Sequence, residues 1–289
     1  MSSTGAKVTS ESLRGVKKAP VQPLRPLPFD QPAALELSVA RAKVLDHFFI
    51  SWTGPALHTA FDAGTGVGYF AGHLADRHGL RVTALDARAP NVAEAQRRYP
   101  GVEFLVGDIE DPALPSLGTF DLVTALGLLY HLENPFRAVR NLVAMSGQVV
   151  AIESIIAPGR RARAWILDEF VGEDQASSCV AWHLTERCIV KLLYRAGMPN
   201  VYRARFSAPH VQFRGNLFRR PARTFVIGSR VPLAQAQFER IPESFNHLDR
   251  AYYLRLAGRT VLWPLLEWRR RNKSAAVAAE ENCRTELSK

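Results

Sequence analysis

Three glycines at alternate positions, Gly64, Gly66 and Gly68, follow a short apolar run and a carboxylate, Asp62, in the stretch TAFDAGTGVGYF. A turn with so few side chains lets a ligand lie directly against the backbone, and the start of a following helix offers unpaired N–H groups. Two further carboxylates, Asp86 and Asp108, end the apolar runs of RVTALDA and VEFLVGDIED. Carboxylate oxygens accept hydrogen bonds from hydroxyl and amine groups. The pattern therefore predicts a binding site for a polar cofactor.

Residues that could take up a proton follow two later apolar segments. His131 and Tyr130 stand near the end of FDLVTALGLLYHL, and Glu153 stands in VVAIES. Histidine titrates near neutral pH, so His131 is the first candidate for a general base or for a group that orients the acceptor. Glu153 is the second candidate, and Tyr130 would shape the acceptor pocket. The structural alternatives are that His131 caps a helix beginning near Asn134 and that Tyr130 simply packs.

Histidine and cysteine follow no spacing that is typical of a metal site. The chain has 8 histidines and 3 cysteines, and no two cysteines form a CxxC pair. We therefore expect neither a metal nor a disulfide framework. No apolar run reaches the roughly 18 residues of a membrane-spanning helix, and the first residues lack the apolar core of a signal peptide. The sequence predicts a cytoplasmic protein.

The positive charge is concentrated in one stretch, residues 187–230, here called the basic segment. The formal net charge is +10, and the basic segment holds ten lysines or arginines and no acidic residue. Arg203 and Arg205 share one face of a predicted strand, and Arg219 lies in the arginine–aromatic loop RGNLFRR. These arginines, together with His183 ahead of a predicted helix, favour an anionic or phosphorylated acceptor. Solubility alone is the alternative.

The elements that position these residues alternate along the chain. Apolar residues at helical spacing predict helices over 35–49, 69–78, 91–99, 135–145 and 185–196. Short apolar runs predict strands over 59–61, 81–85, 102–106, 120–126, 148–152, 201–206 and 223–228. This alternation predicts a parallel sheet with helices on both faces. The last two strands should pair antiparallel, because their connection is too short for a crossover helix.

Composition divides the chain into three parts. Residues 1–30, rich in serine, lysine and proline, read as a flexible lead-in, and residues 31–230 carry the alternating pattern of one domain. Residues 231–289 read as a helical, basic extension. Its stretch VLWPLLEWRRR sets tryptophans beside three arginines, which predicts either peripheral contact with an anionic membrane or a helix packed on the domain.

The order of these motifs resembles the class I S-adenosylmethionine-dependent methyltransferase superfamily. A dinucleotide-binding enzyme would carry its third glycine where Tyr69 stands. The pattern D-x-G-x-G-x-G, followed by acidic residues after the second and third strands, is instead typical of this superfamily, and the resemblance covers about residues 56–230. It implies an α/β, Rossmann-like fold with a seven-stranded, mostly parallel sheet, an antiparallel closing hairpin and helices on both faces. It also implies S-adenosyl-L-methionine as the cofactor.

The resemblance further assigns expected contacts to that cofactor. Asp86 would bind the two ribose hydroxyls, and Asp108, with Ile109 beside it, would contact the adenine amino group. Leu126 would line the methionine side. Asp62 and the three glycines (Gly64, Gly66 and Gly68) would hold the loop, the ribose and the methionine amine.

A second, weaker resemblance bears on the identity of the methyl acceptor. The segments GLLYHLENPFRAVRNL, AIES and WHLTERCIVKLLYRAGMPNV are similar to the branch of tRNA wobble-uridine carboxymethyltransferases. The same features occur in methyltransferases of sugar and lipid biosynthesis. We expect O-methylation of a small, sugar or lipid-linked acceptor. A tRNA base is the alternative substrate, and a cofactor-binding protein without catalysis is the alternative class.

Overall fold

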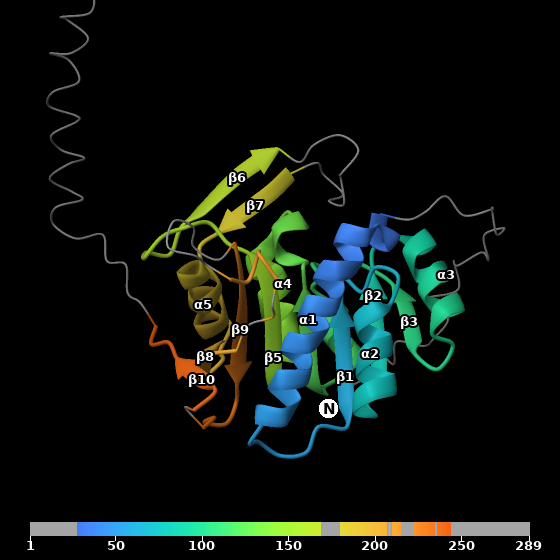
Figure 1. Ribbon diagram of the computed structural model, residues 1–289, viewed down its shortest axis with the longest axis horizontal. Helices are drawn as coiled ribbons and strands as arrows, with labels where there is room; N and C mark the ends of the chain where they lie inside the picture. Colours follow the sequence, from blue (N-terminus) through green and yellow to red (C-terminus); the bar gives the residue numbers. More distant parts are fainter. Residues whose placement is uncertain are drawn as a thin grey trace, which may run out of the picture.

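The computed structural model describes residues 28–168, 180–206, 208, 210–214, 222–234 and 236–243. Its main sheet has eight strands in the order β10-β8-β9-β5-β4-β1-β2-β3 (Figure 1). Along the chain these are β1 Thr59–Ala63, β2 Arg81–Asp86, β3 Glu103–Val106, β4 Phe120–Leu126, β5 Ser146–Ile155, β8 Asn200–Ala204, β9 Arg223–Ser229 and β10 Phe238–Arg240. Strands β1 to β5 pair in parallel, which confirms the predicted parallel sheet. Their carboxyl ends therefore meet along one rim.

Helices cover both faces of this sheet (Figure 1). Helices α1 Pro32–Ser51, α2 Tyr69–His78 and α3 Ala89–Arg98 pack into one hydrophobic core, and α4 Pro135–Met145 and α5 Glu186–Arg195 into a second. Neighbouring residues of β4 serve both cores: Leu122 lies in the first and Val123 in the second. Successive strand side chains point to opposite faces, so the uninterrupted apolar runs of the sequence fill both cores.

Local signals set the ends of two helices. Helix α2 lies between Gly68 and Gly79, whose φ angles are 84° and 67°, and the N–H of Gly79 donates to the carbonyl of Ala75. Helix α4 begins at a proline, and the side chain of Asn134 ahead of it accepts a hydrogen bond of 3.0 Å from the N–H of Arg137. The helices predicted over 69–78 and 135–145 match the structure at both ends.

The predicted closing hairpin is confirmed, but the sheet continues beyond it. Strand β9 pairs antiparallel with both β5 and β8. Strand β10 then pairs antiparallel with β8, and its Phe238 is fully buried. The described sheet thus has eight strands rather than seven, and it continues past residue 230, where the sequence placed the end of the domain. The rest of the predicted helical extension, from residue 244, lies outside the described residues.

A small second sheet lies over the rim. Strands β6 Ala164–Asp168 and β7 Val180–Leu184 pair antiparallel, in a stretch for which the sequence predicted no strand. This β6–β7 hairpin extends beyond the carboxyl ends of the parallel strands in Figure 1. A hydrogen bond of 3.2 Å from the indole N–H of Trp182 to the carbonyl of Glu133 ties it to the segment after β4.

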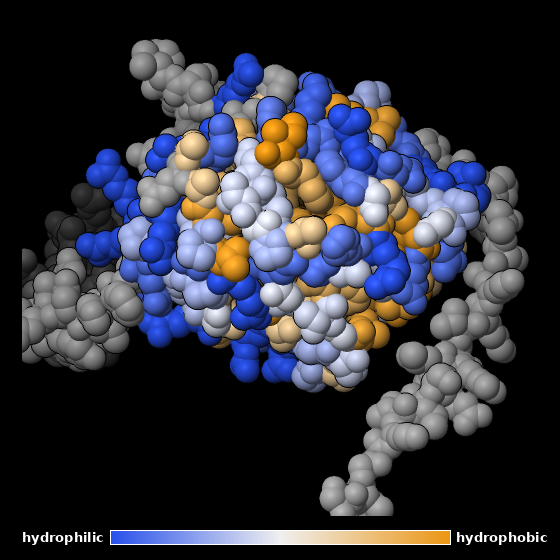
Figure 2. Space-filling view, turned by 90° about the horizontal axis from the view of Figure 1, so that it is seen from below, coloured by the Kyte–Doolittle hydropathy of each residue, from blue (hydrophilic) through white to orange (hydrophobic). Residues whose placement is uncertain are grey.

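The opposite end of the molecule is mainly polar. Figure 2 shows the face at the amino ends of the parallel strands, where hydrophilic residues predominate and apolar residues are scattered. None of the helices in the described part of the chain is both long and apolar enough to cross a membrane.

Candidate functional site

The glycine loop, residues 64–68, joins β1 to α2 at the carboxyl rim. The strand order reverses between β1 and β4, and in open α/β sheets ligands bind at such a switch point. Gly64, Gly66 and Gly68 have φ angles of 69°, 56° and 84°, a conformation that residues with a Cβ rarely adopt. The loop therefore has the backbone conformation that its three glycines predicted.

Side chains approach this loop too closely for any Cβ. A Cβ on Gly68 would lie 2.9 Å from the ring of Phe104, so this glycine serves the packing of the loop against β3. A Cβ on Gly66 would lie 2.9 Å from the ring of Phe29, and one on Gly64 would lie 2.6 Å from Leu128. Phe29 belongs to the short helix η2 Pro28–Asp30, inside the predicted flexible lead-in. Phe29, near the end of the predicted lead-in, thus packs on the loop.

Asp86, at the end of β2, holds the glycine loop in place. Its Oδ2 accepts a hydrogen bond of 2.8 Å from the N–H of Gly66. Its Oδ1 accepts from the N–H of Arg88 at 2.9 Å and from the side-chain amide of Asn91 at 3.1 Å. A carboxylate offers about four acceptor positions. Three of these positions are used, so one acceptor position remains for a ribose hydroxyl. The resemblance had implied contacts with two hydroxyls, and the second would require the side chain of Asn91 to move away.

Asp62 is buried at the end of β1. Its Oδ1 accepts a hydrogen bond of 2.7 Å from the hydroxyl of Thr124, whereas its Oδ2 has no hydrogen-bond partner among the described residues. Burial raises the pKa of Asp62 to about 6, against the lowering effect of the Thr124 hydrogen bond. A buried carboxylate oxygen without a partner costs free energy, so Oδ2 provides a ready acceptor for an ammonium group.

The remaining predicted cofactor contacts differ in exposure. Asp108 is exposed, and its Oδ1 accepts a hydrogen bond of 2.8 Å from the N–H of Glu110. This hydrogen bond stabilises a turn and occupies an oxygen that a ligand could otherwise use. Ile109 and Leu126 are both buried in the hydrophobic cores. The positive-φ glycine loop and the open Oδ2 of Asp62 fit a ligand with a cationic amine and hydroxyl groups, as S-adenosylmethionine has. That fit supports the expected cofactor.

Glu153, the second predicted base, lies at the end of β5 with no exposed surface. Its Oε2 lies 2.7 Å from Nε of Arg41, and its Oε1 accepts a hydrogen bond of 2.9 Å from Arg223. Burial lowers the pKa of Arg223, but the charge of Glu153, the effect of Tyr130 and the hydrogen bonds to both residues together raise it above its ordinary value. Both oxygens of Glu153 are occupied by guanidinium groups. Its role in this structure is therefore to neutralise two buried arginines rather than to act as an open base.

The same arginine connects Glu153 to the predicted catalytic pair. The guanidinium of Arg223 lies 5.6 Å from the ring centre of Tyr130 and donates a long hydrogen bond of 3.5 Å to its hydroxyl. The rings of Tyr130 and His131 lie 4.2 Å apart, within the short helix η4 Leu129–His131 after β4. Asn134 itself caps α4, so the structural alternative in which His131 provides that cap is not needed. Tyr130 and His131 are half-buried at the rim.

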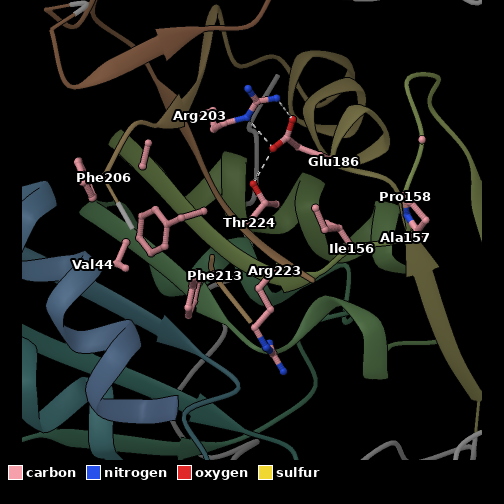
Figure 3. A pocket seen from close by; sticks show the side chains of 13 residues that line it. Val44, Ile156, Ala157, Pro158, Glu186, Arg203, Phe206, Phe213, Arg223 and Thr224 are labelled. Atoms are coloured by element: carbon pink, nitrogen blue, oxygen red, sulfur yellow. Dashed lines mark hydrogen bonds and ion pairs between the residues drawn. The ribbon is translucent and has the colours of Figure 1, made fainter. Parts of the chain in front are cut away.

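A cavity of about 350 Å³ opens beside this network, above the ends of β5, β8 and β9 (Figure 3). Its apolar wall includes Val44, Phe206 and Phe213. Its polar wall is a hydrogen-bonded group in which Arg203 and Thr224 both donate to Glu186. Figure 3 shows the guanidinium of Arg223 directed away from this group. The cavity has the size of a small-molecule site, with one apolar and one polar side.

The predicted acceptor-binding residues do not gather into one cationic surface. Arg203 forms ion pairs with Glu186 and, at 2.9 Å, with Glu239. Burial opposes ionisation of Glu186, but the hydrogen bonds from Arg203 and Thr224 hold the pKa of that carboxyl below its ordinary value. Arg203 is thus engaged within the protein rather than open to an anion. Arg205 follows β8 and is exposed.

The other two acceptor predictions have different outcomes. His183 is half-buried in β7, where it pairs in register with Trp165 of β6. Arg219 lies outside the described residues. Two further arginines of the basic segment have partners within the protein: Arg195 pairs with Glu243 at 2.8 Å, and Arg230 donates to the carbonyls of Ser146 and Val143.

Arg41 and Arg223 were missed as site residues. Arg41 lies on α1 in register with Val44, Leu45 and Phe48, the apolar stripe of that helix, and this was the available signal. A charged residue on such a stripe needs a buried counter-charge. Arg223 opens an apolar strand, and nothing in its neighbours in the sequence pointed to Glu153.

Comparisons with known proteins show similarity to methyltransferases. Residues 61–146 match the model of a family described as a methyltransferase domain. This range includes the glycine loop, Asp86, Asp108 and His131. The ubiquinone biosynthesis O-methyltransferase of Xanthomonas axonopodis pv. citri (strain 306) is 30% identical over 142 residues, which cover 47% of this chain and 50% of that protein. The match therefore spans half the length of that relative.

Solved structures share the fold. The N-terminal domain of EvdMO1 with SAH bound is similar with a TM-score of 0.54 and 18% identity, over 69% of this chain and 84% of that one. A methyltransferase from Mesorhizobium loti described as S-adenosylmethionine-dependent has a TM-score of 0.50 and 21% identity, over 67% of this chain and 100% of that one. At these identities the likeness concerns the fold.

Proposed function

We propose that this chain, whose residues 61–146 match the methyltransferase-domain family, is a class I S-adenosylmethionine-dependent methyltransferase that transfers a methyl group from S-adenosyl-L-methionine to a hydroxyl of a small or lipid-linked acceptor. The observation that carries this proposal is the cavity of about 350 Å³ beside Arg223, at the same rim as the glycine loop. Sites of this volume suit small molecules.

The residues of this chain would bind and orient the cofactor, and the cofactor would supply the methyl group. S-adenosylmethionine, when bound, supplies a methyl group on a sulfonium that a nucleophile can attack. The open Oδ2 of Asp62 would bind its amine, and the free acceptor position on Asp86 would bind a ribose hydroxyl. The exposed carboxylate of Asp108 would contact the adenine. Much of the acceleration of such a transfer comes from positioning.

His131 is the residue that we propose as the base. Its imidazole lies against Tyr130, and Tyr130 contacts Arg223, which lines the acceptor cavity. A hydroxyl bound at this edge of the cavity would give its proton to the imidazole, and the Tyr130 hydroxyl and Arg223 would orient the acceptor.

Exposed apolar residues favour an acceptor with an apolar part. On β6, Trp165, Ile166 and Leu167 expose 40%, 62% and 44% of their surface beside the rim. The cavity wall formed by Phe206 and Phe213 is also apolar. An acceptor with a hydroxyl-bearing ring and an apolar chain would use both surfaces.

The test uses purified protein with methyl-labelled S-adenosylmethionine and an extract of cells that lack this protein. The extract is separated after reaction into lipid, small-molecule and RNA fractions. Label in the lipid or small-molecule fraction supports the proposal. Label that nuclease releases from RNA would replace it with the tRNA alternative. Absence of label from every fraction, with S-adenosylhomocysteine still bound, would favour a cofactor-binding protein without catalysis.

His131 is tested once a labelled acceptor is in hand. His131→Asn should lower kcat at least roughly 100-fold, because general-base catalysis contributes at least that much, with the affinity for S-adenosylhomocysteine unchanged. His58→Asn is the matched control, because His58 is exposed and precedes β1, at the opposite end of the sheet from the rim. Full activity of His131→Asn would remove His131 as the base.

A further inference from the structure

Three potential metal ligands meet between α1 and α2. Asp46 of α1 and His73 and His78 of α2 bring their ligand atoms within 4.8 Å of one another. Nε2 of His73 lies 2.8 Å, and Nε2 of His78 lies 2.9 Å, from the same oxygen, Oδ1 of Asp46. No other group of three such side chains is found in the described part of the chain.

The surroundings fix the orientation of these side chains. The ring of His78 stacks on Phe49 of α1 at 3.8 Å with an angle of 13°. The side chains of His73, His78 and Asp46 are exposed by only 18%, 13% and 25%. Ligands held in place by packing lose less entropy when they bind an ion. This group is pre-organised by the α1–α2 contact.

The protonation states suit a metal. Burial opposes ionisation of Asp46, but its hydrogen bond with His73 and the remaining histidine contacts hold the pKa of that carboxyl below its ordinary value. Burial lowers the pKa of His78, against the effect of Asp46. A carboxylate and a neutral imidazole are the forms that bind a metal ion.

We propose that Asp46, His73 and His78 form a Zn²⁺ site that clamps α1 to α2. Two imidazole nitrogens and a carboxylate oxygen are donors that zinc accepts, with water in the fourth position. Zinc–ligand bonds of about 2.0–2.1 Å need ligand atoms about 3.3 Å apart, so the two short contacts would open by about 0.5 Å. This inference replaces the sequence-based expectation of no metal.

The site is separate from the catalytic rim. His73 and His78 lie about 6 Å and about 14 Å along α2 from its first residue, Tyr69, which follows the glycine loop. None of the three ligands lines the acceptor cavity. The zinc would therefore stabilise the fold rather than take part in methyl transfer.

Arg77 is the competing cation. Its Nε lies 3.4 Å from Oδ2 of Asp46, the oxygen that the histidines leave open. Its side chain is 66% exposed, so it can turn into solvent at little cost when an ion binds. Arg77→Gln should consequently tighten zinc binding, whereas loss of a ligand should weaken it.

The experiment uses the full chain without a histidine tag, stripped with a chelator and then passed into chelator-free buffer. Zinc binding is measured by calorimetry, and the melting temperature is measured with and without a small excess of zinc. We expect one zinc per chain and a zinc-dependent rise of several degrees. Cobalt in place of zinc should give the visible absorption of a four-coordinate ion.

Variants separate this site from binding elsewhere. His73→Asn and His78→Asn should each weaken zinc affinity at least roughly 100-fold, as expected for a lost ligand. The zinc-dependent change in melting temperature is the readout, since each variant can also shift the metal-free protein. His58→Asn, an exposed histidine outside the group, is the control and should bind as the unaltered chain does. Absence of binding in the unaltered chain, or undiminished binding in both ligand variants, would overturn the proposal.

Discussion

Glu153 is the counter-charge of two arginines, Arg41 and Arg223, which are themselves almost fully buried. Removing one partner of a buried ion pair leaves an uncompensated charge, which is far more costly than losing a surface pair. Here one carboxylate serves two guanidiniums. The arrangement also fixes Arg223 against Tyr130, so a structural residue positions the residues proposed for catalysis.

Glu153→Gln should therefore lower the free energy of unfolding by about 3 kcal/mol or more. Urea denaturation measures this change. The matched control is Arg97→Met, which removes an ion pair with Glu94 at a side chain 60% exposed, and it should change stability far less, because water screens an exposed pair. A Glu153→Gln protein as stable as the control would show that the buried ion pairs contribute nothing in solution.

Asp62 should make cofactor binding depend on pH. With a pKa of about 6, the ionised fraction of this carboxyl falls about tenfold from pH 7 to pH 5. If the carboxylate binds the cofactor amine, the affinity for S-adenosylhomocysteine should fall by about the same factor. Calorimetric titration at the two pH values measures it, and Asp62→Asn should bind weakly at both. A flat pH profile in the unaltered protein would contradict the assignment.

The same pKa predicts the opposite sign for the stability of the protein without cofactor. The pKa of Asp62 lies above the unfolded value of about 3.9. Its contribution to stability is therefore fully present below about pH 4 and is lost as the pH rises through 6. Asp62→Asn should raise the melting temperature at pH 7. An unchanged or lower melting temperature there would show that burial of this carboxylate costs the fold little.

At the scale of elements, Thr185 joins the β6–β7 hairpin to α5. Its hydroxyl caps α5 by accepting from the N–H of Cys188 at 3.2 Å, and it donates to the carbonyl of Arg161 at 2.9 Å. It also accepts from the N–H of Arg163 at 3.0 Å. One buried hydroxyl thus satisfies a helix end and the strand segment beside it.

Thr185→Ala should lower the free energy of unfolding by about 1–2 kcal/mol, through loss of the cap and of the bonds to the hairpin. Thr185→Ser keeps the hydroxyl and should lose much less. Chemical denaturation of the three proteins compares them. Equal losses for alanine and serine would attribute the effect to the methyl group rather than to the hydrogen bonds.

At the scale of the whole molecule, β10 completes the core. Phe238 is fully buried, with its ring centre 6.3 Å from Phe48, 6.3 Å from Tyr202 and 5.9 Å from Phe206. It connects α1 to β8 across the edge of the sheet. The domain therefore extends at least to this strand.

A chain ending at residue 230 should be clearly less stable than one ending at residue 243. Loss of a buried phenylalanine costs about 3–5 kcal/mol, which corresponds to a fall in melting temperature of at least about 6 °C for a domain of this size. Thermal unfolding of the two truncated chains measures the difference. Equal melting temperatures would restore the boundary at residue 230.

The sequence by itself determined what depends on near neighbours. Gly68, Gly79 and Pro135 set helix ends by their backbone preferences, and the glycine loop needs positive φ wherever it is placed. The apolar alternation gave the parallel sheet and its closing hairpin. These features use residues a few positions apart, so a linear pattern is sufficient.

Only the tertiary structure decided which charges meet. Arg41, Glu153 and Arg223 are far apart in the chain and come together because α1, β5 and β9 pack at one rim. Asp46 likewise lies 27 residues from its partner His73, so no spacing within one helix revealed the group. The basic segment looked free because its acidic partners, including Glu153, Glu186 and Glu239, lie outside it. A count of charges along the sequence does not show which charged residues the fold brings together, and the energy of an ion pair depends on the distance between its charges in space.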